Sequence, residues 1–197
     1  MVLLLNLVLV AGLVAVGLTA HSLAVLAEGG DCLLDAAGVI VALLAIRVPA
    51  RFPRRPDGHP AATGIAALVN GGWLLLLELI VAGAAVSRLV SGTPGVEGLP
   101  MLVASGIAAL VMTAGALVLH GDASDESEGR DLSVAAVLLD TAADAAAAAG
   151  TAAAGGVILA TGGWNWLDPA VALAIAVVVA SQALVLIRKV AGRLRAT

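Results

Sequence analysis

The sequence contains no tyrosine, one phenylalanine and one cysteine, and only 12% of its 197 residues are charged. Soluble domains carry about a quarter charged residues, so this low fraction argues against a soluble enzyme. A single cysteine excludes an intrachain disulfide and a C-x-x-C metal motif. A net charge of −4 provides no basic surface for phosphates, which argues against a nucleic-acid partner. Apolar sequence is abundant instead, because 61% of the residues are hydrophobic and the mean hydropathy is +1.08.

The apolar residues gather in six long stretches, each able to span a hydrocarbon core about 30 Å thick. These stretches lie at residues 2–20, 22–46, 61–90, 99–119, 132–160 and 169–187. They lack two-residue alternation and are separated by segments rich in Pro and Gly, which favours helices over barrel strands. The predicted fold class is therefore all-α, a polytopic membrane protein with six transmembrane helices and no soluble domain.

Basic residues are distributed unevenly between the two sides of this predicted bundle. Nine of the ten follow the second, fourth and sixth stretches, and only Arg88 lies at the end of an odd-numbered one. Cytoplasmic loops retain Lys and Arg, so the asymmetry places both termini in the cytoplasm. Residues 1–20 lack the basic start of a signal peptide and are expected to form the first span. We expect a multi-pass protein of the cell membrane.

Acidic residues fall inside the apolar stretches, where an ionised side chain costs at least about 2.5–3.5 kcal/mol on insertion scales. They are Glu28, Asp31, Asp35, Glu78, Asp140 and Asp144. The four aspartates form two D-x-x-x-D pairs, and a four-residue spacing puts both carboxylates of a pair on one helix face. Like charges at that spacing repel, so helix stability does not explain the pairs, and a functional role is favoured.

Both aspartate pairs are predicted to lie near the middle of the membrane. At about 1.5 Å per residue, the aspartates of each pair lie about 14 and 20 Å from the surface where their stretch begins. Four converging carboxylates must take up protons or bind a divalent cation. Oxygen ligands suit manganese, iron or zinc, and the lack of thiolate and imidazole argues against copper(I). Small residues over 142–155 would allow close helix approach, although an Ala-rich run also simply favours a helix.

Further motifs accompany the aspartate pairs. Residues 22–28 are S-L-A-V-L-A-E and residues 163–169 are G-W-N-W-L-D-P, with weaker features at Asn6, His59-Pro60 and A-L-V-N-G over 67–71. Over nearly the whole chain, these motifs resemble the cation diffusion facilitator family. Its members have an S-L-A-L-L-A-D opening before the second-span metal motif, H-x-x-x-D or D-x-x-x-D in the fifth span, and G-W-x-W-x-D-P before the sixth.

The resemblance implies a secondary active transporter, not an enzyme, that exports divalent metal ions from the cytoplasm in exchange for protons. It implies that the transported metal binds Asp31, Asp35, Asp140 and Asp144, and that the chain forms a homodimer in the lipid bilayer. No separate cofactor is expected. Zinc or manganese is the expected cargo, with iron, cobalt and cadmium as further candidates. The transport domain would cover residues 1–190, followed by a short basic cytoplasmic tail over 191–197.

Three departures from the family pattern bear on these expectations. Most members continue past the sixth helix into a cytoplasmic metal-sensing and dimerising domain, so this chain resembles a short form. The segment after His59-Pro60 lacks the family's Y-G-x-G-R-A-E, which puts an accessory site near that loop in doubt. Asp140 stands where zinc carriers commonly have histidine. An all-aspartate set resembles the manganese-type branch more than the zinc branch.

Four other residues have more than one interpretation. Glu28 could belong to an outer exit path or merely lie near the interface, and Glu78 could relay protons or form a helix contact. His59 and His120, both predicted in cytoplasmic loops, could receive incoming metal or simply be solvated. Two alternative functions also stay open: a non-transporting partner subunit of a full-length metal carrier, and a proton or solute channel that uses the same acids.

Overall fold

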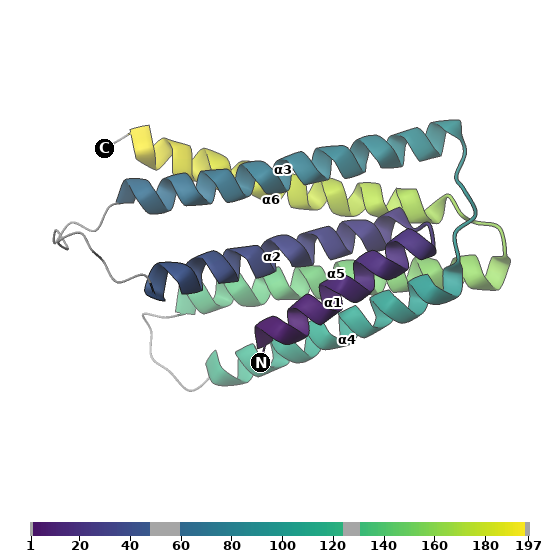
Figure 1. The fold of residues 1–197 in the computed structure, drawn as a ribbon, viewed down its shortest axis with the longest axis horizontal. Coiled ribbons are helices and arrows are strands. Elements are labelled where there is room, and N and C mark those ends of the chain that lie inside the picture. The colour runs from purple at the N-terminus through teal and green to yellow at the C-terminus, as the bar shows by residue number, and fades with distance from the viewer. Residues whose placement is uncertain (1, 48–59, 124–130, 196–197) are drawn as a thin grey trace.

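The protein is described by a computed structural model over residues 2–47, 60–123 and 131–195, and some side chains within these ranges fall outside the description. The described chain forms six helices: α1 (Val2–Thr19), α2 (Leu23–Arg47), α3 (Pro60–Ser91), α4 (Gly98–Ala123), α5 (Asp131–Thr161) and α6 (Leu167–Arg195). They run lengthwise in one elongated bundle, in which α3 and α6 lie side by side (Figure 1). The all-α prediction with six helices is confirmed.

Two helices extend more than one residue beyond the ends that the sequence predicts. α4 extends to Ala123, past the predicted end at 119, so the backbone of His120 lies in a helix rather than a loop. α6 begins at Leu167 and extends to Arg195, past the predicted end at 187. Neither extension contains a proline that would end a helix, and basic residues are favoured at a helix C-terminus. Apolar content marks the membrane-spanning part of a helix, not its end. The division of the chain at 190 stays a prediction.

Four of the six described helices, α3 to α6, have the length and composition of membrane spans. Among the described residues, the apolar stretches long enough to cross a bilayer are Leu68–Ser91, Gly98–Leu117, Thr141–Thr161 and Leu167–Lys189, and α1 contains the shorter stretch Asn6–Thr19. Large apolar side chains such as Leu79, Leu110 and Val177 are exposed on the outside of the bundle. Such a surface is typical of a protein whose solvent is lipid. The chain is a multi-pass membrane protein.

α2 occupies the centre of the bundle. Within the described residues it contacts each of the other five helices, whereas the most extensive pairings are those of α4 with α5, α3 with α6 and α1 with α2. The buried core around α2 is built mainly from small side chains, including Ala24, Ala27, Ala108 and Ala148. Small side chains let helices pack closely without a hydrophobic driving force between them. Acidic residues on α2 are therefore placed where several helices meet.

α4 and α5 approach each other closely at two glycines. A Cβ atom on Gly155 of α5 would lie 2.7 Å from the Leu102 backbone nitrogen, and one on Gly98 of α4 would lie 2.7 Å from the Gly155 carbonyl oxygen. The small residues of the fifth span thus do allow a close approach. However, the extensive contact of α5 is with α4, and its contact with α2 is small. The sequence pattern shows that one face of α5 carries small side chains, but it does not show which helix packs against that face.

Candidate metal centre

Asp31 and Asp144 line the same cavity. Asp31 lies on α2 and Asp144 on α5, and the cavity between them has a volume of about 480 Å³. Small residues of α5 and apolar residues of α6 form most of its wall, together with the amide side chain of Gln182. The structure therefore brings together one aspartate from each predicted pair, although 113 positions separate them in the sequence (144 − 31). Sequence reasoning missed Gln182, whose signal is a polar residue inside the apolar sixth span.

The other two predicted ligands can be placed only by their backbones. Asp35 lies in α2 and Asp140 in α5, and their side chains lie outside the described part of the structure. α2 and α5 run in opposite directions (Figure 1). Asp35 is therefore one turn beyond Asp31, and Asp140 is one turn before Asp144, both toward the same end of the bundle.

The described side chains do not by themselves form a complete metal-binding site. Within that described set, no group of three or more His, Cys, Asp or Glu residues lies close enough to hold a metal ion. Because this set includes only two of the four predicted ligands, the four-aspartate site stays a prediction.

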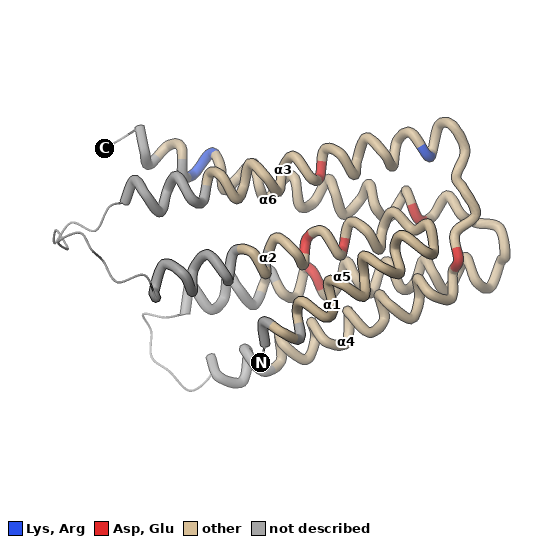
Figure 2. The backbone as a smooth tube through the Cα atoms, viewed as in Figure 1, with Lys and Arg blue, Asp and Glu red and all other residues tan. Residues whose placement is uncertain are grey.

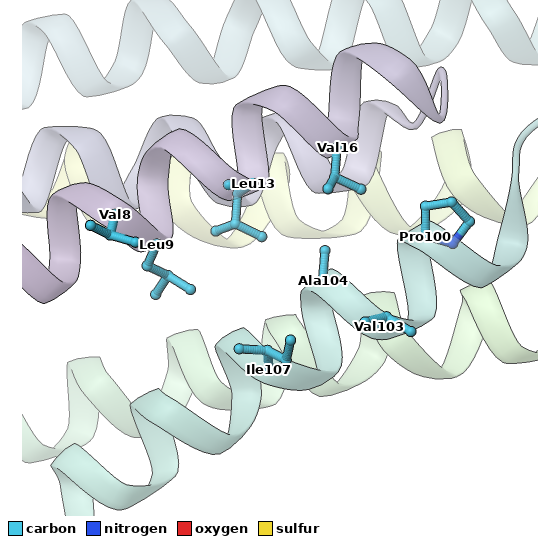
Figure 3. Close-up of a pocket in the computed structure, with 9 residues that line it drawn as sticks. Val8, Leu9, Leu13, Val16, Pro100, Val103, Ala104 and Ile107 are labelled. Carbon is cyan, nitrogen blue, oxygen red and sulfur yellow. The ribbon is translucent and has the colours of Figure 1, made fainter.

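A second cavity has a different chemical character. A groove of about 320 Å³ between α1 and α4 is lined by apolar residues from both helices (Figure 3). Val8, Leu13 and Ile107 are among them, and none of its lining residues carries a titratable group. A hydrated cation would find no oxygen side chain there to replace its lost water. Of these two cavities, only the one containing Asp31 and Asp144 has the chemistry for binding a cation.

Acidic residues of three helices lie at a similar level, near the middle of the bundle (Figure 2). Besides Asp31 and Asp144, they include the two buried glutamates, Glu28 on α2 and Glu78 on α3. Glu28 accepts a 2.7 Å hydrogen bond from the Ser105 hydroxyl of α4, whereas its Oε1 atom has no hydrogen-bond partner among the described residues. Sequence reasoning missed Ser105, because a lone serine in an apolar helix gives no sign of its partner.

Asp168, in the first turn of α6, fixes the N-terminus of α2. Its Oδ1 atom accepts a 2.6 Å hydrogen bond from the Ser22 hydroxyl and a 3.0 Å bond from the Ala24 backbone nitrogen, and its Oδ2 accepts a 2.8 Å bond from the Leu23 nitrogen. Ser22 in turn accepts a bond from the Val25 nitrogen, as an N-cap residue does. The motifs at 22–28 and 163–169 thus meet in one buried capping network.

Arg88 ties α3 into this network. Its Nη1 atom lies 3.4 Å from Oδ2 of Asp168 and donates a 2.7 Å hydrogen bond to the carbonyl oxygen of His21. His21 itself adopts a positive φ of 59° at the turn between α1 and α2. The Arg88 side chain therefore joins α3, α6 and the α1–α2 turn. This explains why one basic residue is placed at an end of the bundle that otherwise has few charges.

Comparison with known proteins of similar sequence assigns this chain to a family. The sequence profile of the cation efflux transmembrane domain matches residues 1–194. The chain belongs to the cation efflux family. It is 33% identical over 177 residues to "Zinc transporter ZitB" of Pectobacterium atrosepticum, covering 88% of this chain and 53% of that protein. It is 30% identical to the Escherichia coli protein of the same name, covering 85% and 52%.

A relative with a different name matches a similar share of the chain. "Cadmium, cobalt and zinc/H(+)-K(+) antiporter" of Bacillus velezensis is 27% identical over 186 residues, which cover 90% of this chain and 57% of that protein. The chain spans about half the length of the curated relatives it matches. The family resemblance of the sequence motifs is thereby confirmed, and with it the cation-efflux type of transmembrane bundle.

The predicted metal-receiving roles of His59 and His120 concern side chains outside the described part of the structure. His59 lies outside the described residues. The backbone of His120 lies in the last turns of α4, but its side chain is not part of the description. A role for either in receiving metal therefore stays a prediction.

Proposed function

We propose that this chain exports a divalent metal cation across the membrane, and that Asp31, Asp35, Asp140 and Asp144 bind the cation during transport. The observation that carries this proposal is the cavity shared by Asp31 and Asp144. Each carboxylate in a membrane span costs at least about 2.5–3.5 kcal/mol on insertion scales, and such residues normally mark an ion pathway. Two of them facing one cavity from antiparallel helices are explained by a cation between them.

The helix register supports the inclusion of Asp35 and Asp140. Each lies one turn from its partner on the same helix face, and both are displaced toward the same end of the bundle. The four residues therefore occupy facing stretches of α2 and α5. Four carboxylates give a donor set made only of oxygen, with a formal charge that a divalent cation partly neutralises.

The cargo is a divalent transition metal, with zinc and manganese as the leading candidates. Relatives whose printed names specify zinc, cadmium or cobalt support this class of substrate. Carboxylate oxygens also suit manganese and iron, whereas zinc sites more often include imidazole or thiolate. No separate cofactor is proposed.

Exchange with protons follows from the chemistry of the ligands. A carboxylate oxygen that holds a metal cannot hold a proton, so metal entry expels protons and protons arriving from outside release the metal. Alternating access of the cavity to the two sides of the membrane would couple the two flows. The printed name of the Bacillus velezensis relative, which includes H(+), supports proton coupling. The transporter would thus be secondary active.

We place the transport domain at residues 1–190, in the cell membrane, with both termini and the basic tail at 191–197 in the cytoplasm. The support is the excess of Lys and Arg after the second, fourth and sixth helices. We further propose that two copies associate as a homodimer in the bilayer.

The test is metal flux into proteoliposomes that contain the purified chain and a pH-sensitive dye. We expect saturable uptake of zinc, manganese or both. Uptake should alkalinise the lumen, because protons leave as metal enters, and it should be faster when the lumen is made acidic beforehand. A chain that moves no metal alone would be a partner subunit instead. Proton flux without divalent metal would identify a channel, and metal flux insensitive to pH would contradict proton exchange.

A further inference from the structure

Gln182 is a polar residue in the apolar span of α6 that the four-aspartate site does not use. It lies seven residues before the end of that span at Lys189 (189 − 182), about 10 Å inside it along the helix axis. Its side chain lines the cavity that contains Asp31 and Asp144. Polar side chains inside a membrane span are costly, and where they face an internal cavity they mark the path of an ion or substrate.

Gln182 lies at one end of this cavity. α2 and α6 run in the same direction (Figure 1), and Asp168 in the first turn of α6 accepts a hydrogen bond from the Leu23 backbone nitrogen at the start of α2. Counted from this contact at about 1.5 Å per residue, Asp31 lies about 12 Å along α2 and Gln182 about 21 Å along α6. The α6 residues that line the cavity run from Val171 to Gln182. Gln182 is therefore the α6 lining residue nearest the end of the bundle proposed to face the cytoplasm.

The rest of the cavity wall offers a cation no other polar side chain. Besides Gln182, Asp31 and Asp144, the lining consists of Ala, Val, Ile and Gly residues. A cation that arrives through the cytoplasmic end of the cavity gives up water before it reaches a carboxylate. An amide oxygen is a neutral ligand that divalent cations accept in place of water, and without a charge it holds the ion weakly enough to release it toward the next site.

We infer that the amide oxygen of Gln182 binds the divalent cation at the cytoplasmic end of the cavity, before the cation reaches Asp31 and Asp144. This inference rests on the proposed function. It assigns Gln182 to capture of the cation, about 9 Å from the level of Asp31, and not to the coordination sphere at the aspartates. Loss of the amide should therefore raise the metal concentration needed for half-maximal transport and leave the maximal rate little changed.

A polar contact between helices makes a different prediction. If the Gln182 amide formed a hydrogen bond with a second copy of the chain, its loss would weaken that association and lower the maximal rate, while KM stayed the same. Ser181→Ala is the matched control. Ser181 is the neighbouring exposed polar residue of α6, it does not line the cavity, and its hydroxyl donates a 2.6 Å hydrogen bond to the Val178 carbonyl oxygen of its own helix.

The test is zinc and manganese uptake into inside-out membrane vesicles that contain the full chain, so that the metal meets the cytoplasmic face first. For Gln182→Leu we expect KM to rise at least about tenfold, as for loss of a group that supports a metal site, and the maximal rate to stay within about twofold of wild type. Gln182→Glu keeps an oxygen at the same position and should not raise KM, and Ser181→Ala should match wild type. An unchanged KM for Gln182→Leu, or a lower maximal rate alone, would overturn the inference.

A second variant keeps the inference testable if Gln182→Leu does not fold. Gln182→Met provides another apolar side chain of similar length, and the same rise in KM is expected. Failure here can be told apart from failure of the proposed function. If wild-type and Gln182→Leu vesicles take up metal with the same KM, only the role of Gln182 is lost. If wild-type vesicles take up no metal, the proposed function fails and this inference fails with it.

Discussion

Asp144→Asn is expected to reduce divalent metal flux at least about 100-fold while leaving the folded bundle intact. Replacing residues that merely support a metal ligand typically costs about 10–100-fold in metal affinity or activity, so loss of a ligand should cost at least the upper value. Asn has nearly the size of Asp, and Asp144 is partly exposed to the cavity. The substitution therefore removes charge with little change in packing. Flux in proteoliposomes and circular dichroism of the same preparation measure the two effects.

The control for Asp144→Asn is an acid away from the cavity. Glu97 directly precedes the first residue of α4, is exposed, and does not line the cavity. Glu97→Gln should retain flux within about twofold of wild type, because it removes neither a proposed ligand nor a residue that supports one. If Asp144→Asn transports metal as well as this control does, Asp144 is not a ligand.

Asp168→Ala is expected to destabilise the protein by about 3 kcal/mol or more. The substitution leaves the Ser22 hydroxyl and the backbone nitrogens of Leu23 and Ala24 without their acceptor, and each buried unpaired donor costs about 1–3 kcal/mol. It also removes the carboxylate that faces Arg88. Thermal unfolding in detergent should show a lower Tm for this variant.

Two further variants separate the capping role of Asp168 from a general effect of substitution. Asp168→Asn retains one acceptor oxygen and should be less destabilising than Asp168→Ala. Thr161→Ala removes only an exposed hydrogen bond to the Val157 carbonyl oxygen at the end of α5, and should change the Tm little. Equal Tm values for Asp168→Ala and Thr161→Ala would show that the network does not stabilise the N-terminus of α2.

The helices were predictable because hydropathy acts locally. A continuous apolar run of membrane-spanning length has to satisfy its own backbone hydrogen bonds, and a helix does so without reference to the rest of the chain. The ends of α4 and α6 were not predictable from hydropathy, since polar residues continue both helices outside the apolar part.

The candidate site was only partly predictable from the sequence. The spacing of Asp31 and Asp35, and of Asp140 and Asp144, indicates the helix face of each pair without knowledge of the fold. The link between Ser22 and Asp168 spans 146 positions, so no local pattern contains it. The pairing of Ser105 with Glu28 is hidden for the same reason. Contacts between helices depend on how the bundle packs, and that information is spread over all six spans.

The four-carboxylate site is tested most directly by locating the metal in the protein. Crystals of the full chain grown with zinc should give one strong anomalous difference peak between α2 and α5. That peak should lie about 2.0–2.2 Å from carboxylate oxygens of Asp31 and Asp144, the usual range for zinc–carboxylate bonds, with Asp35 and Asp140 completing the coordination. An empty cavity in crystals whose only zinc peaks lie at surface residues such as His21 or Glu97 would contradict the account.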